Sequence, residues 1–213
     1  MELDYERAER KRAELRMIAE KAAADFQQIA GVQRDEAELK KVAAEVIGNF
    51  AEVDPPEKED LFNIGLIVLN PGGRGGGRSL KPGNVRLNML KLMHAVAGGV
   101  ASVVTAINTP WLAPFVAVRT WHDLRASVDV TITERDAAVL WTMWKHRDGS
   151  NYVAEDGLLN AVDSEMAAHG HQSISQIELD DSLATLSKIS TIARATSLKG
   201  NWWLREWIQV KYR

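Results

Sequence analysis

The segment from Ser127 to the C-terminus carries a regular succession of helix and strand signals, and this constrains the fold most. Ser127–Ile132 alternates polar and apolar residues, which predicts a half-buried strand. Thr133, with Asp136 three residues later, predicts the start of a helix through a variant of the capping box. Ser175 and Glu178 form a full capping box and predict the start of another helix. Two helix starts are therefore fixed by their own local chemistry.

The rest of this segment fits between and after those two starts. A further helix is predicted over 154–168, which Gly170 ends, and the turn before it contains Gly149. Two strands, 190–196 and 201–212, are predicted on either side of a turn that contains Gly200. The helix that starts after Ser175 carries apolar residues at helical spacing, namely Leu179, Leu183, Leu186 and Ile189.

Residues 127–213 resemble the winged-helix superfamily of helix-turn-helix proteins in the order of their elements, their caps and the closing pair of strands. The resemblance implies either DNA binding or the docking of another protein. A winged helix that reads DNA needs a basic third helix, because phosphate contacts supply much of the affinity. Here that helix begins Glu178-Leu179-Asp180-Asp181, and its only cation is Lys188. The resemblance therefore implies docking rather than DNA reading.

Composition is that of a globular protein with an uneven charge. Of the 213 residues, 46% are hydrophobic and 26% are charged, and none is cysteine. The absence of cysteine excludes disulfides, thiolate metal sites and a cysteine nucleophile. The first residues are acidic and have no apolar core, so we expect no secretory signal and a cytoplasmic protein. Residues 61–130 hold seven Lys and Arg against two Asp and Glu, whereas the chain as a whole has a net charge of −3.

The N-terminal residues predict two helices joined by a short turn. Apolar residues spaced by three or four positions predict a helix over residues 1–30, which Gly31 ends. Asp35 is placed to cap a second helix, and Pro55-Pro56 stops the pair. The second helix carries a clean apolar stripe, namely Leu39, Val42, Ala43, Val46, Ile47 and Phe50. We expect this helical hairpin to pack its stripe on the rest of the chain, because a hairpin alone buries too little apolar surface.

Residues 92–118 form a run of 27 residues without Asp, Glu, Lys or Arg. A run of this length is enough to cross a bilayer, which takes about 20 residues, and cations flank its N-terminal side. His94, Asn108 and Pro110 cut it into shorter pieces, which favours buried core helices over membrane contact or a surface covered by a partner. The composition predicts one helix over 84–108 and a second over 111–125, interrupted by Pro114.

A glycine- and arginine-rich loop over 70–79 invites a phosphate-binding interpretation. Gly72, Gly77, Arg78 and Ser79 match the spacing of a P-loop, and the apolar run 61–69 before them reads as a strand. However, the motif has lysine where Arg78 stands, and Pro82-Gly83 interrupts the helix that should follow. We expect a solvent loop and no nucleotide site.

The final predicted strand is the best candidate for binding. If residues 201–212 stay extended, alternate side chains share one face, and on it two tryptophans interleave with three cations. These candidate interaction residues are Trp203, Arg205, Trp207, Lys211 and Arg213. Such a face suits a protein interface or stacking on nucleic-acid bases. The alternative is that Trp203 and Trp207 pack on Trp141 or Trp144 within the same unit.

Signals for catalysis and metal binding are weak. The pair His169-Gly170-His171 lies in a predicted loop with no carboxylate adjacent in the sequence, and a zinc site needs more ligands at defined spacing. His122-Asp123 reads as a surface turn or a helix end, and no nucleophile has a base at a recognisable spacing. We therefore expect no catalytic residues, no metal and no cofactor.

Together these observations predict a mainly α protein with a small β component. Its expected parts are a helical hairpin (1–54), a Gly/Arg loop with an apolar helical segment (55–126) and a winged helix (127–213). The expected function is that of a non-enzymatic interaction or adaptor subunit, which docks a partner protein through its winged helix and its helical hairpin. Self-association is the other expected form of docking, and no small-molecule substrate is expected. The alternatives are a membrane-associated effector or anchor that uses residues 92–118, and a DNA-binding regulator.

Overall fold

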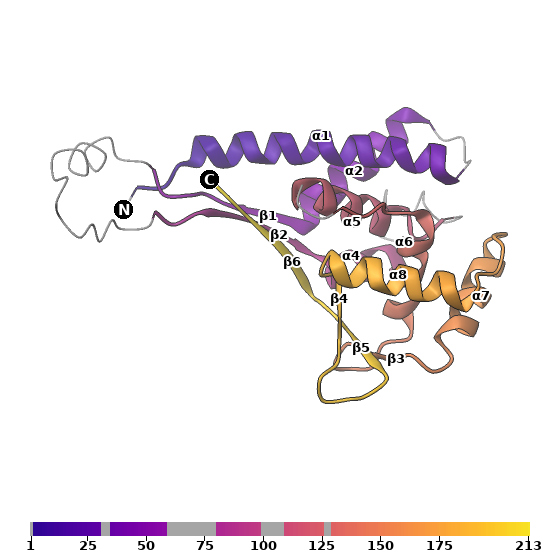
Figure 1. Ribbon diagram of the computed structural model, residues 1–213. Helices are drawn as coiled ribbons and strands as arrows, with labels where there is room; N and C mark the ends of the chain where they lie inside the picture. Colours follow the sequence, from indigo (N-terminus) through magenta and orange to yellow (C-terminus); the bar gives the residue numbers. More distant parts are fainter. Residues whose placement is uncertain (1, 31–34, 59–79, 99–108, 126–128) are drawn as a thin grey trace.

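The computed structural model describes residues 2–30, 35–58, 80–98, 109–125 and 129–213 (Figure 1). Of these residues 57% are helical, and the strands form two small antiparallel sheets, so the chain is mainly α with a small β component, as predicted. The helices are α1 (Tyr5–Ala30), α2 (Glu36–Phe50), α4 (Met89–Ala97), α5 (Leu112–Arg125), α6 (Glu134–Lys145), α7 (Leu158–Ala168) and α8 (Gln176–Lys188). The strands are β1 (Ala51–Asp54), β2 (Gly83–Asn88), β3 (Tyr152–Ala154), β4 (Ile192–Arg194), β5 (Asn201–Leu204) and β6 (Trp207–Tyr212).

The N-terminal helical hairpin forms as the sequence predicts. The Asp35 carboxylate accepts a hydrogen bond from the backbone N–H of Ala37 and caps α2. Every residue of the predicted α2 stripe, from Leu39 to Phe50, is buried. Both helices pack on α5, so the stripe is covered by the chain itself.

Helix α5 lies at the centre of the molecule, in contact with α1, α2, α4, α6 and β6 (Figure 1). Its residues Leu112 to Val118 are all buried, and the Phe115 ring meets Phe26 of α1 edge to face at 5.1 Å. Pro114 does not interrupt the helix, because it lies in the first turn, where a backbone N–H has no helical acceptor. The described end of the uncharged run is therefore a core helix.

Strands β1, β2 and β6 form one antiparallel sheet in the order β1-β2-β6. The predicted helix over 84–108 is wrong at its start, because β2 occupies 83–88. Val85 and Leu87 are buried while their polar neighbours are half-buried, which is the two-residue period of a strand. The helix prediction rested on the composition of the whole segment and missed this period. Asn88 ends the strand and caps α4, because its side-chain carbonyl accepts from the N–H of Lys91 at 2.8 Å.

Strands β3, β4 and β5 form the second sheet, in the order β3-β5-β4. The strand predicted over 127–132 is wrong, because residues 129–132 are not in a strand and β3 pairs with β5 instead. Ile132 is fully buried, so the apolar positions of that segment serve the core without a β partner. Helix α7 begins later than predicted, at Leu158, because Gly157 before it adopts a left-handed backbone with φ 74°.

Both predicted capping boxes are present. Thr133 and Asp136 exchange side-chain and backbone hydrogen bonds at the start of α6, and Ser175 and Glu178 do the same at the start of α8. The four predicted core positions in and just after α8 are at most 2% exposed, namely Leu179, Leu183, Leu186 and Ile189.

The last strand joins the C-terminal residues to the sheet of β1 and β2. Strand β6 pairs with β2 over six residues, from Trp207 opposite Asn88 to Tyr212 opposite Gly83. Tyr212 also donates a hydrogen bond to the carbonyl of Asp54 in β1. A Cβ on Gly83 would lie 2.5 Å from the Tyr212 ring, so this close approach requires glycine. Segments 1–54, 55–126 and 127–213 therefore share one sheet.

Truncating the centre of α8 tests how its apolar side is packed. Leu183 is 2% exposed, so Leu183→Ala should lower the free energy of unfolding by about 2–5 kcal/mol. Asp180→Ala, at an exposed position of the same helix, should change it by about 0.5 kcal/mol or less. Urea denaturation measures both, and equal effects would contradict the assigned facing of the helix.

A partly buried carboxylate gives the fold an acid-sensitive contact. Burial opposes ionisation of Glu165 of α7, but hydrogen bonds from Lys145 and from the Trp141 indole, both on α6, outweigh it. The pKa of Glu165 is therefore below its usual value. A carboxyl whose pKa falls on folding stabilises the protein above its unfolded pKa, and this contribution is lost as the pH falls.

We accordingly expect Glu165→Gln to be less stable than the original protein at neutral pH. The difference in unfolding free energy should shrink as the pH falls through and below about 4.5, the ordinary pKa of glutamate. Urea denaturation of both proteins between neutral and acidic pH measures the difference. A difference that stays constant over this range would show that ionised Glu165 does not stabilise the fold.

Candidate interaction surface

The candidate interaction residues are divided between two strands rather than placed on one. The predicted single strand over 201–212 is wrong, because the chain leaves β5 at Arg205 and starts β6 at Trp207. The Arg205 N–H donates to the carbonyl of Thr191 at 3.0 Å, and the Glu206 carbonyl accepts from the N–H of Met89 at 2.8 Å. These two bonds fix the break, and they place Trp203 in one sheet and Trp207 in the other.

Adjacent tryptophans on β5 have opposite roles. Trp202 is 5% exposed, and the Arg194 guanidinium lies 4.0 Å from its ring centroid. Trp203 is 38% exposed and points to the other side of the strand. Trp202 and Leu204 of β5 are both buried, and so is Ile208 of β6, so each strand turns one side toward the core.

The surroundings of Trp203 come from three elements. Tyr152 of β3 and Ala193 of β4 are its cross-strand partners and therefore share its face of the sheet. The Arg205 guanidinium lies 5.8 Å from the centroid of the Trp203 ring. Sequence reasoning missed Tyr152 and Ala193, because strand pairing brings them to this face from distant positions.

Trp207 and Lys211 belong to the outer face of the β1-β2-β6 sheet. Trp207 is half-buried, and the Arg86 guanidinium of β2 lies 5.6 Å from its ring centroid. Arg86 itself pairs with Glu52 at 2.9 Å and with Asp54 at 3.3 Å. Its charge is therefore compensated within the sheet.

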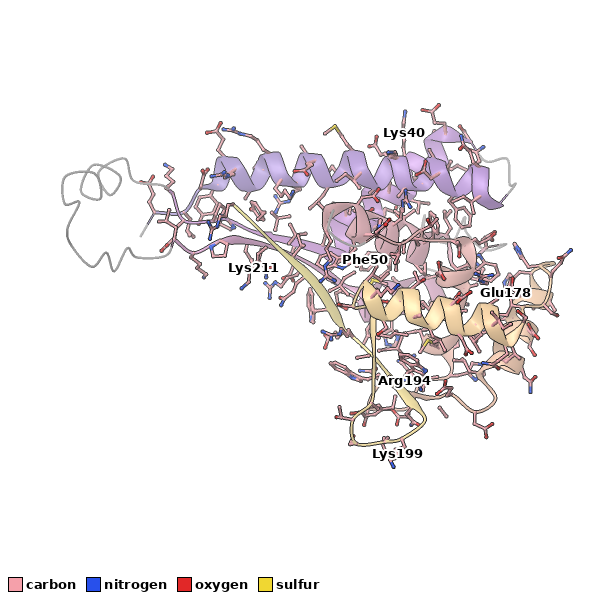
Figure 2. The ribbon with its side chains drawn as sticks, viewed as in Figure 1. Lys40, Phe50, Glu178, Arg194, Lys199 and Lys211 are labelled. Atoms are coloured by element: carbon pink, nitrogen blue, oxygen red, sulfur yellow. The ribbon has the colours of Figure 1, made fainter. Side chains whose placement is uncertain are left out.

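Lys211 and Arg213 remain uncompensated. Both are exposed, and neither has an ion pair within the part of the chain that the structure describes. Figure 2 shows Lys211 near one end of β6, away from Lys199 on the β4–β5 loop. Lys211 also lines a cavity of about 470 Å³ together with Lys81, Asp54 and Asn84.

Helix α8 presents acidic groups at its first turns. Asp180 and Asp181 are exposed, and the Glu178 carboxylate pairs with Arg135 of α6 at 2.7 Å. Hydrogen bonds from the backbone and side chain of Ser175 lower the pKa of Glu178 below its usual value. Glu178 lies at the end of α8 away from Lys211 (Figure 2), so acidic and cationic surfaces are separated.

Among the described residues, no ring contact joins Trp203 or Trp207 to Trp141 or Trp144, the packing that the sequence left as an alternative. Trp141 and Trp144 stack on each other, with centroids 5.2 Å apart, and Arg147 lies 4.4 Å from the Trp144 ring. Arg205 and Arg86 are instead the cations beside Trp203 and Trp207.

The histidine pair has a carboxylate neighbour that the sequence did not indicate. Glu134 of α6 lies 3.7 Å from His171, and its carboxylate accepts a hydrogen bond from the Trp111 indole at 2.8 Å. His169 and His171 both meet the Trp111 ring edge to face. Among the described residues no three His, Asp or Glu side chains are grouped to hold a metal ion.

The phosphate-binding and membrane hypotheses fall partly or wholly on residues that the structure does not describe. The Gly/Arg loop at 70–79 and residues 99–108 of the uncharged run lie outside the described residues. In the parts of the chain that the structure describes, no helix is both long and apolar enough to span a membrane.

His122 and Asp123 lie near the end of α5, which agrees with the prediction of a helix end. His122 Nδ1 and Asp123 Oδ1 are 3.0 Å apart.

Known proteins give no analogy for this surface. Comparisons of the chain with protein-family models, with curated proteins and with solved structures found no match. No activity or partner of a relative is therefore transferred to this chain.

Replacing each of the paired tryptophans tests their opposite roles. Trp202→Ala should lower the free energy of unfolding by about 3–5 kcal/mol, because it empties a buried site. Trp203→Ala should lower it by less than about 1 kcal/mol, because much of that ring is exposed. Urea denaturation measures both, and a large loss for Trp203→Ala would mean that its ring serves the fold rather than a partner.

Proposed function

We propose that the chain is a non-enzymatic interaction subunit that docks a partner protein through its C-terminal face. The name C-terminal face covers two neighbouring parts of the chain: Trp203 with Arg205 at the β3-β5-β4 sheet, and Trp207, Lys211 and Arg213 on and after β6. The observation that carries the proposal is the exposed Trp203 ring, 38% accessible on the central strand of its sheet with the Arg205 guanidinium beside it. Tryptophan and arginine are enriched among the residues that dominate protein interfaces.

The part of the chain that bears this face is proposed to be a winged helix. Three helices, α6, α7 and α8, are followed by the β4–β5 hairpin, and β3 completes a three-stranded sheet with it. This arrangement supports the proposal in spite of the missing strand before α6. In such a unit the β4–β5 loop is the wing, and it carries the exposed Leu198 and Lys199.

The electrostatics of α8 favour a protein partner over DNA. In the helix that would enter the major groove, Asp180 and Asp181 are exposed and would repel phosphate. A DNA-binding regulator is the second candidate, and the exposed cations Lys199, Lys211 and Arg213 favour it. Such a protein would use the strands rather than α8.

The helical hairpin has a smaller part in docking than the sequence suggested. Its apolar stripe on α2 is buried by α1 and α5, so no partner reaches it. What the hairpin offers a partner is the outer side of α1, where Tyr5 and Met17 are 67% and 66% exposed.

Binding to the isolated partner tests the C-terminal face. Trp203→Ala and Trp207→Ala should each weaken the complex by about 2 kcal/mol or more, as the loss of aromatic anchors does. The double change Lys211→Gln/Arg213→Gln should mainly slow association and reduce its dependence on salt. Surface plasmon resonance with the partner recovered by affinity purification measures both effects.

A matched control uses an exposed apolar residue far from this face. Ile29→Ala, near the end of α1, should leave affinity unchanged, because Ile29 is 50% exposed on another element. The DNA alternative is tested by the anisotropy of a labelled duplex at about 150 mM salt, where non-specific binding is weak. Tight duplex binding that is lost on changing Arg205 and Lys211 to alanine would replace the protein partner by DNA.

A further inference from the structure

Among the described residues, strand β6 is an edge strand without a backbone partner on its outer side. The order β1-β2-β6 leaves β6 paired with β2 alone. Within the described residues, no backbone hydrogen bond reaches β6 from any element other than β2. Alternate residues of its six therefore direct N–H and C=O groups away from the sheet, over a length of about 20 Å.

At the opposite side of this sheet, the residues that follow β1 have backbone partners. After β1, the N-terminal residues pair with the chain, because the N–H of Asp4 donates to the carbonyl of Pro56 and the N–H of Lys58 donates to the carbonyl of Glu2. Leu3 and Glu57 form an isolated bridge in the same place. The residues that follow β1 are thus paired with the N-terminal residues, whereas no described element pairs with the outer side of β6.

The side chains of β6 favour an added strand that carries negative charge. No acidic residue occurs from Trp207 to Arg213, and Lys211 and Arg213 are exposed without ion pairs among the described residues. A lysine on an edge strand disfavours pairing with neutral or basic strands. A second copy of β6 would bring the same cations, so a segment rich in Asp or Glu is the complementary occupant.

The two faces of β6 also differ, and this difference predicts which residue types alternate along a strand added beside it. Gln209 and Lys211 are exposed on the outer face, whereas Val210 and Tyr212 on the inner face are only half-buried. A strand laid beside β6 would place alternate side chains next to each of these faces. Acidic residues suit the positions beside Lys211, and apolar residues suit those beside Val210.

We propose that an extended partner segment of alternating acidic and apolar residues adds to β6 as a fourth strand of the β1-β2-β6 sheet. The segment supplies main-chain hydrogen bonds along the open edge, and its carboxylates lie beside Lys211 and Arg213. This inference rests on the proposed function and names the class of segment that the partner contributes.

The test uses the full chain and a labelled eight-residue peptide of alternating Glu and Val, with blocked termini. Two further versions carry N-methyl groups on one or the other set of alternate amides. Fluorescence anisotropy should show binding of the unmethylated peptide, and one methylated version should bind at least about tenfold more weakly. The other should bind as before, because its methyl groups point away from β6.

Two controls separate edge pairing from general charge attraction. A peptide of alternating Lys and Val should not bind, and Lys211→Glu should weaken the Glu and Val peptide by about two- to fivefold. Hydrogen exchange of the β6 amides should slow when the peptide is added, whereas that of α1 should not change.

The outcomes distinguish this inference from the proposed function. If both methylated peptides bind as tightly as the parent, or if no peptide binds at millimolar concentration, strand addition is overturned. If the protein instead forms dimers that Lys211→Glu alters, a second copy occupies the edge and the acidic segment is overturned. The tryptophan variants test the proposed function separately, because they measure partner affinity whatever happens at the β6 edge.

Discussion

The burial of α5 is the constraint on which the rest of the structure depends. Its first half, Leu112 to Val118, carries no charge and is buried, so other elements must cover it on every side. Helices α1, α2, α4 and α6 and strand β6 do so, and the Trp121 indole donates to the carbonyl of Ile189 at the end of α8. A helix that is hydrophobic all round can be stable only inside a larger core. Elements from all parts of the sequence therefore converge on one helix, and the N-terminal hairpin becomes part of the core instead of an independent arm.

The position of β6 follows from the same convergence. The chain leaves β5 at Arg205, is fixed there by backbone bonds to Thr191 and Met89, and then pairs with β2. Ile208 closes the inner side of the sheet, while Lys211 and the outer edge of the strand remain open. One strand thus connects the C-terminal residues to β2 and presents an edge that no described element pairs with. Rigid elements position binding groups more accurately than loops do, which suits a docking role for this strand.

Charge is divided between two surfaces. The first turns of α8 expose carboxylates, whereas the end of β6 exposes Lys211 and Arg213. Arg86 and Arg194, which also lie near tryptophan rings, are compensated by Glu52 and Glu155 within the chain. Lys211 and Arg213 have no ion pair among the described residues, and they lie at the end of the strand whose outer edge has no described partner. Uncompensated rim charges act mainly on association rate and on the choice of partner, so this distribution favours selection of an acidic partner.

The sequence by itself determined the elements that depend on local chemistry. The caps at Asp35, Thr133 and Ser175, the stripe of α2 and the core side of α8 are set by neighbours three or four residues away, and each is found as predicted. The exposed Trp203 and buried Trp202 also follow from alternation along one strand. Only the tertiary structure decided which strands pair. Strand β2 formed inside a predicted helix, and β3 formed although the sequence had predicted a strand over 127–132. Trp203 and Trp207 were separated into two sheets. A strand gains its hydrogen bonds from residues distant in sequence, such as Asn88 opposite Trp207. Local pattern therefore cannot specify which strand forms or which edge stays open.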